Sequence, residues 1–223
     1  MPRGDRIITK CSSRITEPTQ IHSVLAQAFC LASSNRAGPV HIDIPIDITY
    51  AQDLKLDDYQ RSSPQRSLPE ASLVNATVEQ LRQARKVVIC ACRGILVHHA
   101  EAELMNLAEL LSAPVVCTTY AFGSFPLDHP LSLGTFSEFS GNEFAFDLIE
   151  EADFLLLLGM RSNTTLTGIL ARHAPANTVF VGLDESESFQ KMEAFPVAGW
   201  GDNKLFLEEL LEHSAEFTVC PKS

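Results

Sequence analysis

Four residues that stand at the ends of apolar runs have the properties needed to hold a nucleotide. Gly94 follows "VVICA", Gly159 and Arg161 lie at the end of "FLLLLGMR", and Asp184 follows "TVFVGL". Glycine lets the backbone approach a ligand closely, arginine neutralises phosphate, and an acidic side chain at a strand end holds a ribose hydroxyl. Together they predict a nucleotide groove at the ends of the strands that these runs would form.

A structural explanation of the glycines stays open beside the nucleotide hypothesis. Chains that alternate strands and helices need glycine at strand-to-helix turns whether or not they bind a ligand. Neither G-x-G-x-x-G nor G-x-x-x-x-G-K-[ST], the two common phosphate-binding fingerprints, occurs in the sequence. The spacing alone does not decide between the two explanations.

The other polar residues do not favour catalysis or metal binding. His129 precedes Pro130, a pattern typical of a histidine that stabilises a turn, and Asp184, Glu185 and Glu187 read as a solvated acidic loop. No serine stands in a G-x-S-x-G elbow. We therefore expect neither a catalytic residue nor a metal ligand in this chain.

The cysteines predict buried free thiols. Cys90, Cys92 and Cys117 lie in apolar, strand-like runs, where a cysteine behaves as a small hydrophobic residue. Cys90-x-Cys92 has the spacing of neither a redox pair nor a zinc knuckle.

The composition is that of an acidic globular protein. The chain has 223 residues, 45% of them hydrophobic, with a formal charge of −11 and a pI near 5.0, so it lacks the basic face of a nucleic-acid binder. The longest apolar run, "FLLLLGM", is far shorter than the ~20 residues of a membrane span, and the first ten residues lack a signal-peptide core. We expect a soluble cytoplasmic protein with reduced thiols, whose partners include neither nucleic acid nor membrane.

Four short apolar runs predict the strands of an α/β domain, at residues 87–91, 114–118, 154–159 and 178–183. Runs so uniformly apolar are typical of strands covered on both faces, as in a parallel sheet. Helical patterns lie between them, so the predicted fold class is α/β with a doubly wound parallel sheet. In the helix at 98–111, Glu101, Glu103 and Glu109 should face solvent, and the apolar face is Leu104, Leu107, Ala108 and Leu111.

The amino-terminal segment predicts a smaller α/β piece. "RIIT" at 6–9 reads as a strand, Pro18 opens a helix that reaches Ser33, and 40–44 alternates as a second strand. The buried face of this helix should be Ile21, Val24, Leu25, Ala28, Phe29 and Ala32. The predicted organisation is a partial α/β segment at 1–50, a linker at 51–72, a complete domain at 73–213 and a tail at 214–223.

Several stretches resemble thiamine-diphosphate enzymes of the acetolactate-synthase type, in the order found in that family. The two most specific are "GPVHIDIP" (38–45) and "TTYAFGSFPLDHPLSLG" (118–134), and the resemblance extends from residue 7 to about 213. The family has three α/β domains. The resemblance implies that residues 1–50 are the last part of a pyrimidine-binding domain and that 73–213 are an entire, Rossmann-like central domain.

The resemblance also implies cofactors, thiamine diphosphate and magnesium, that this chain alone should not hold. The family's catalytic glutamate and its GDG metal-diphosphate motif belong to parts of the family that these stretches do not match. Gly201-Asp202-Asn203 lacks the second glycine, and it instead matches the turn between the central domain's last strand and final helix.

Central domains of the family often hold FAD or ADP in a non-redox role. The positions that match this nucleotide site are Gly94, Thr118, Gly123, Gly159, Arg161, Gly168, Asp184, Gly201 and Asp202. Residues bulkier than the family's glycines, in Cys90-Ala91-Cys92 and in the loop after Gly134, would narrow a flavin groove.

Three functional interpretations follow from these observations. The first is part of an acetolactate-synthase-like enzyme, which ligates or decarboxylates 2-oxo acids, with this chain alone inactive. The second is a non-catalytic module that binds a nucleotide or a protein, and the third is one piece of a split enzyme. We expect the chain to form a homo-oligomer or to bind a partner chain that supplies the missing domains.

Overall fold

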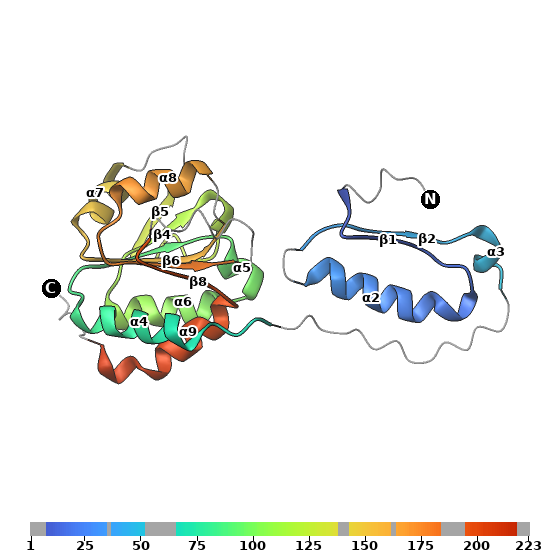
Figure 1. Cartoon of the computed structure of the whole chain (residues 1–223). Coiled ribbons are helices and arrows are strands. Elements are labelled where there is room, and N and C mark those ends of the chain that lie inside the picture. The colour runs from blue at the N-terminus through green and yellow to red at the C-terminus, as the bar shows by residue number, and fades with distance from the viewer. Residues whose placement is uncertain are drawn as a thin grey trace. The chain divides into compact units, whose positions relative to one another are not determined.

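The computed structural model describes residues 8–34, 37–51, 66–137, 143–161, 164–183 and 195–217. The chain divides into two compact units, Met1–Arg66 and Ser67–Ser223, each with its own sheet (Figure 1). This break falls inside the stretch predicted as a linker, and the bounds predicted for the domains on either side stay predictions. In the described part of the chain no helix is long and apolar enough to cross a membrane.

The second unit contains a six-stranded sheet in which every neighbouring pair is parallel. The order across the sheet is β5-β4-β3-β6-β7-β8. The first strand, β3, is central; β4 and β5 follow on one side of it, and β6, β7 and β8 follow on the other. This is the 3-2-1-4-5-6 order of doubly wound dinucleotide-binding folds. The strands are β3 (Val87–Ala91), β4 (Val115–Thr118), β5 (Ser132–Phe136), β6 (Phe154–Met160), β7 (Thr178–Gly182) and β8 (Val197–Trp200).

Helices cover both faces of this sheet. In Figure 1, α4, α6 and α9 lie on one face and α7 and α8 on the other. Ile89 and Ala91 of β3 belong to the core under the first group, whereas Val88 and Cys90 belong to the core under the second. The helices are α4 (Ala71–Gln83), α5 (Gly94–His98), α6 (Glu101–Leu111), α7 (Glu143–Glu151), α8 (Thr164–His173) and α9 (Asn203–Glu212), with short 3-10 helices η2 (Thr119–Ala121) and η4 (Ser214–Glu216).

The predicted α/β fold class is confirmed, and one predicted exposure is wrong. All four residues expected on the apolar face of α6 are buried: Leu104, Leu107, Ala108 and Leu111. Glu103, expected in solvent, is only 14% exposed, and its Oε1 lies 3.3 Å from Lys204 Nζ of α9. The reason is that α6 packs beside α9, so the polar side of one helix meets the other.

The first unit is a β-α-β arrangement. Strands β1 (Cys11–Arg14) and β2 (Val40–Asp43) pair in parallel with Cys11 opposite Val40, and they are joined through η1 (Pro18–Gln20) and α2 (Ile21–Ser33); α3 (Ile46–Thr49) follows. Of the strand expected at 6–9, residues 6 and 7 lie outside the described residues, and Ile8 and Thr9 are not in a strand. Strand β1 begins at Cys11, opposite the first residue of β2, because a parallel ladder needs a partner along its length.

Helix α2 is less buried than its pattern predicts. Of the six residues expected on its buried face only Ala28 is buried, and Phe29 is 53% exposed. Two four-residue strands offer too little surface to cover a 13-residue apolar helix. The exposed apolar side chains of this unit also include Ile46 and Tyr50.

We expect the second unit to fold without the first. Both of its core clusters are built only from residues between Leu73 and Phe217. A chain of residues 67–223 should unfold cooperatively, with a Tm within about 4 °C of the full chain, the shift that about 1 kcal/mol produces in a domain of this size. Calorimetry measures both, and loss of the cooperative transition in the shortened chain would show that the two units form one cooperative structure.

Candidate functional site

The strand order places the candidate site at the carboxyl ends of β3 and β6. In open α/β sheets, ligands bind in the crevice outside these ends, where the order reverses. β3 and β6 are neighbours here, and the chain continues from them into Gly94 of α5 and into Arg161, which is exposed.

Gly94 and Gly159 are packed directly against one another. A Cβ atom added to Gly94 would lie 2.3 Å from the Cα of Gly159, and one added to Gly159 would lie 2.4 Å from the Cα of Gly94. Gly159 also has φ +69°, a left-handed conformation that favours glycine. Close packing of the β3–α5 turn on β6 therefore accounts for both glycines, whether or not a phosphate lies nearby.

The β4 side of the site is a loop with a buried base and an exposed surface. Thr118 ends β4 and is buried, and Ala121 and Phe125 are buried beneath the loop. Tyr120 and Phe122, between these buried positions, are 65% and 62% exposed. Gly123 follows with φ +88°, a backbone conformation that favours glycine, although an added Cβ would meet no atom within 4 Å.

On the β8 side of the site, the backbone N–H groups at the start of α9 donate hydrogen bonds within the protein. Asp202 caps α9 and accepts hydrogen bonds from the backbone N–H groups of Lys204 (2.9 Å) and Leu205 (3.2 Å). The Asn203 N–H donates to Nδ1 of His98 at 2.9 Å. Because these three amides are the free donors of the first turn, α9 has none left for a phosphate. Asp202 acts here as a helix cap.

Gly201 serves packing in the same region. A Cβ on Gly201 would lie 3.0 Å from the Cα of Pro69, and the next residue, Asp202, donates its N–H to the carbonyl of Ser67 at 2.8 Å. This contact holds the segment before α4 against the end of β8.

Asn203 and His98 are site residues that the sequence analysis missed. Asn203 is fully buried; its Nδ2 lies 3.2 Å from His98 Nδ1 and donates to the carbonyls of Gly201 (3.2 Å) and Gly182 (3.4 Å). Its Oδ1 is buried with no hydrogen-bond partner. The only sequence signal was the position of Asn203 after Gly201-Asp202; nothing in the pattern around His98 marks it.

Gly168 is not part of this cluster, and the position of Asp184 is not described. Gly168 lies inside α8, and an added Cβ would meet nothing within 4 Å, so it is a helix residue and not part of a strand-end turn. Asp184, the predicted ribose ligand, lies outside the described residues, as do Glu185 and Glu187.

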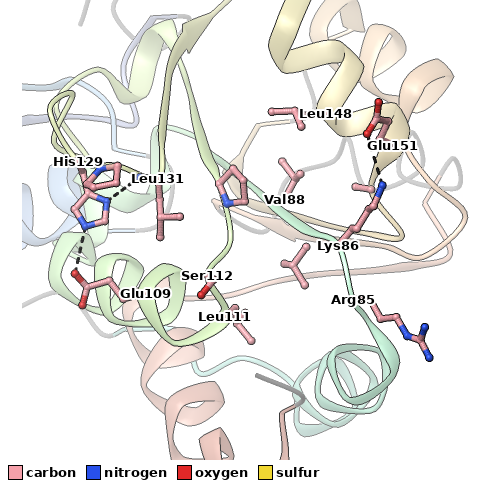
Figure 2. Close-up of a pocket in the computed structure, with 14 residues that line it drawn as sticks. Arg85, Lys86, Val88, Glu109, Leu111, Ser112, His129, Leu131, Leu148 and Glu151 are labelled. Atoms are coloured by element: carbon pink, nitrogen blue, oxygen red, sulfur yellow. Dashed lines mark hydrogen bonds and ion pairs between the residues drawn. The ribbon is translucent and has the colours of Figure 1, made fainter. Parts of the chain in front are cut away.

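A groove of about 780 Å³ lies at the opposite edge of the sheet (Figure 2). It is lined by residues that precede or begin β3, β4, β5 and β6, and thus by the amino ends of the strands. Two polar contacts lie on its rim: the ion pair of Lys86 Nζ with Glu151 at 3.6 Å, and the hydrogen bond of His129 Nε2 with Glu109 at 3.2 Å. In open α/β sheets, ligands bind at the carboxyl ends of the strands, so this groove lies at the edge opposite the candidate site.

A family of known proteins matches most of the second unit. The sequence pattern of "Thiamine pyrophosphate enzyme, central domain" matches residues 74–210, more than half of the chain. The chain belongs to the thiamine pyrophosphate enzymes. The family that the sequence resembles is thereby confirmed, and the doubly wound unit is its central domain.

Curated relatives of this thiamine pyrophosphate enzyme domain are acetolactate synthases. The probable large subunit of Methanocaldococcus jannaschii is 32% identical over 92% of this chain and 35% of its own length. The large subunit of Corynebacterium glutamicum is 32% identical over 92% and 33%, and the chloroplastic enzyme of Arabidopsis thaliana is 32% identical over 95% and 32%. The chain thus spans about a third of the length of the curated relatives it matches.

Solved structures agree on the fold. Benzoylformate decarboxylase from Polynucleobacter necessarius superimposes with a TM-score of 0.68 at 21% identity, covering 92% of this chain and 38% of its own. A Mycobacterium smegmatis protein, described as thiamin diphosphate-dependent, gives a TM-score of 0.69 at 19% identity and covers 99% and 42%.

The described residues do not fit the metal-bound diphosphate of the family's cofactor. In the part of the chain that the structure describes, no three His, Cys, Asp or Glu side chains are grouped to hold a metal ion. At the carboxyl edge, Arg161 is exposed and the loop after Thr118 has an exposed surface, whereas Asn203 is fully buried and the first-turn amides of α9 are bonded within the protein.

The thiols of Cys90, Cys92 and Cys117 are free and buried, as predicted. Cys90 and Cys92 are buried with their Sγ atoms 4.0 Å apart, and Cys117 Sγ lies 3.5 Å from Ser124 Oγ. The hydrogen bond to Cys92 and then burial raise the pKa of Cys90 well above its ordinary value; burial is the main cause that raises the pKa of Cys117. The thiolates needed for nucleophilic or redox chemistry are therefore disfavoured.

His129 stabilises its turn, as predicted. Its Nδ1 accepts from the backbone N–H of Leu131 at 3.2 Å, and its Nε2 contacts Glu109. The ring also packs edge-on against Phe125 with centroids 4.9 Å apart. Figure 2 shows both polar contacts at one end of the groove.

Proposed function

We propose that this chain is the central-domain part of an enzyme that ligates or decarboxylates 2-oxo acids, and that the chain alone does not carry out that reaction. The observation that carries the proposal is the match to acetolactate synthases over 92% of this chain but only 35% of the relative. The whole reaction needs thiamine diphosphate and magnesium, for which the described residues provide no metal-holding cluster. The chain forms a homo-oligomer, or it binds a partner chain that supplies the family's other domains, in the cytoplasm.

The test is an assay of the purified chain with pyruvate, thiamine diphosphate and Mg²⁺. We expect acetolactate and acetaldehyde to form no faster than in buffer, because the groups that would hold and activate the cofactor are not in this part of the family. Turnover that saturates with pyruvate and with thiamine diphosphate would contradict this expectation.

A second function, binding of FAD or ADP, is favoured by the strand order of the second unit. That order creates a switch point between β3 and β6, at whose carboxyl ends nucleotides bind in folds of this kind. The nucleotide's role here is structural or regulatory. Its phosphates lie near Gly94 and Arg161, and Asp184 holds a ribose hydroxyl.

Arg161→Ala should weaken ADP or FAD binding by about 1.5–3 kcal/mol, the value of a hydrogen bond to a charged group. Arg172→Ala is the matched control, since Arg172 is in the last turn of α8 and α8 ends toward the opposite edge of the sheet. Calorimetric titration gives both affinities. Equal affinity of Arg161→Ala and wild type, with circular dichroism unchanged, would remove Arg161 from the site.

A further inference from the structure

We propose that the groove at the amino edge of the sheet binds an amphipathic carboxylate, that is, an aliphatic chain that ends in a carboxylate group. The chain lies over the apolar floor of the groove and the carboxylate lies on the guanidinium of Arg85. At about 780 Å³ the groove is within the range of roughly 300–1,000 Å³ that is typical of small-molecule pockets. This site is at the opposite edge from the nucleotide site proposed above and does not depend on it.

The floor of the groove is an apolar surface where the strands begin. Val88 of β3 is buried, and Leu131 and Leu148 are half-buried. In Figure 2, Val88 and Leu131 lie between His129 at one end of the groove and Arg85 at the other. The two leucines keep apolar surface that a ligand can cover, and covering it favours binding.

Arg85 is the charged group of the groove that is left for a ligand. Four charged side chains line the groove. Glu151 pairs with Lys86 at 3.6 Å. Glu109 accepts a hydrogen bond from His129 Nε2 at 3.2 Å. The guanidinium of Arg85 is exposed and has no hydrogen bond or ion pair with any residue that the structure describes. Its parallel N–H groups match the two oxygens of a carboxylate.

The two ends of the groove decide where the carboxylate lies. At the His129 end both ring nitrogens are in use, because Nδ1 accepts from a backbone N–H and Nε2 donates to Glu109. That end therefore offers an anion no free ring donor, and the carboxylate of Glu109 repels it. At the other end the pair of Lys86 and Glu151 is 65% and 67% exposed, so it is weak and Lys86 can turn toward a second anion at little cost. The carboxylate of the ligand lies at the Arg85 end.

Calorimetric titration of the full chain with decanoate tests the site. We expect saturable binding at one site per chain. The affinity should fall about 4-fold for each CH₂ group removed, in octanoate and then hexanoate, because each CH₂ group leaves the apolar floor. Decylammonium has the same aliphatic chain with the opposite charge, and it should bind at least about 10-fold more weakly than decanoate.

Three variants locate the ligand within the groove. Arg85→Ala should raise the Kd of decanoate roughly 10- to 150-fold, the loss of a hydrogen bond to a charged group. Arg93→Ala is the matched control: Arg93 is also exposed and lies two residues after β3, whereas Arg85 lies two residues before it. It removes the same charge at the opposite edge and should leave the Kd unchanged. Leu148→Gln replaces apolar surface of the floor and should raise the Kd about 5-fold. Circular dichroism confirms that each variant is folded.

Each outcome decides the proposal. Saturable binding of decanoate that weakens in Arg85→Ala and in the shorter carboxylates supports it. Equal affinity for decanoate and decylammonium would overturn it, because the charge would not be recognised. Equal affinity for decanoate and hexanoate would overturn it too, because the aliphatic chain would not lie in the groove. Wild-type affinity in Arg85→Ala would remove the carboxylate from Arg85. No saturable binding of decanoate by the folded chain would overturn the site and would have no bearing on the nucleotide site.

Discussion

Gly94→Ala is expected to lower the free energy of unfolding of the second unit by about 3 kcal/mol, at the upper end of the range for overpacked cores. The new Cβ would lie 2.3 Å from the Cα of Gly159, and the obstacle is backbone, so no flexible side-chain end can move aside. Gly159→Ala should cost at least as much. Its new Cβ would lie 2.4 Å from the Cα of Gly94. The left-handed conformation of residue 159, at φ +69°, would cost alanine about 1–2 kcal/mol more.

Urea unfolding followed by circular dichroism measures these changes, and Gly168→Ala is the control. Gly168 lies in α8 with nothing within 4 Å of an added Cβ, and alanine is favoured over glycine inside helices by about 0.5–1 kcal/mol. This variant should be as stable as wild type or slightly more stable. If Gly94→Ala were equally stable, the close contact between the β3–α5 turn and β6 would not exist in solution.

Asn203→Asp is expected to cost about 3 kcal/mol or more near neutral pH, because it leaves a charge buried without a partner. The Nδ2 group of Asn203 faces three acceptors: the carbonyls of Gly182 and Gly201, and Nδ1 of His98. A carboxylate oxygen in its place would face the same three groups without a proton to share. Asn203→Ala removes the donor without adding a charge and should cost less, about 1–3 kcal/mol.

The pH dependence separates these two variants. Burial raises the folded-state pKa of the new carboxyl above its unfolded value of about 4, so the destabilisation is complete above the raised pKa and disappears as pH falls toward 4. Urea unfolding between about pH 5 and 8 should show Asn203→Asp recovering stability in acid relative to Asn203→Ala. Parallel pH profiles would mean that residue 203 is open to water.

The central strands were predictable from sequence for a physical reason. β3, β6 and β7 have helices on both faces, so every residue in them is buried and the apolar run itself marks the strand. β5 and β8 are the outer strands of the sheet and are mostly half-buried, so they leave no comparable run. The apolar pattern did not predict β8. The resemblance to the family did imply it, because Gly201-Asp202 matches the turn after the central domain's last strand.

The candidate site was less predictable, because its decisive contacts join residues distant in sequence. Glycine at the ends of β3 and β6 was compatible with a phosphate or with packing, and only the fold shows Gly94 and Gly159 in contact. His98 and Asn203 are single polar residues in helical patterns, and their hydrogen bonds depend on how α5 and α9 meet. The exposure of Tyr120 and Phe122 likewise follows from which neighbours anchor the loop.

Parallel calorimetric titrations of the full chain, one with ADP and one with thiamine diphosphate and Mg²⁺, test the central claim most directly. The claim is that this part of a thiamine pyrophosphate enzyme offers a nucleotide site at the carboxyl edge of its sheet but not the catalytic cofactor site. We predict saturable binding of ADP at one site per chain and no saturable binding of thiamine diphosphate. Saturable binding of thiamine diphosphate, with no binding of ADP, would contradict the account.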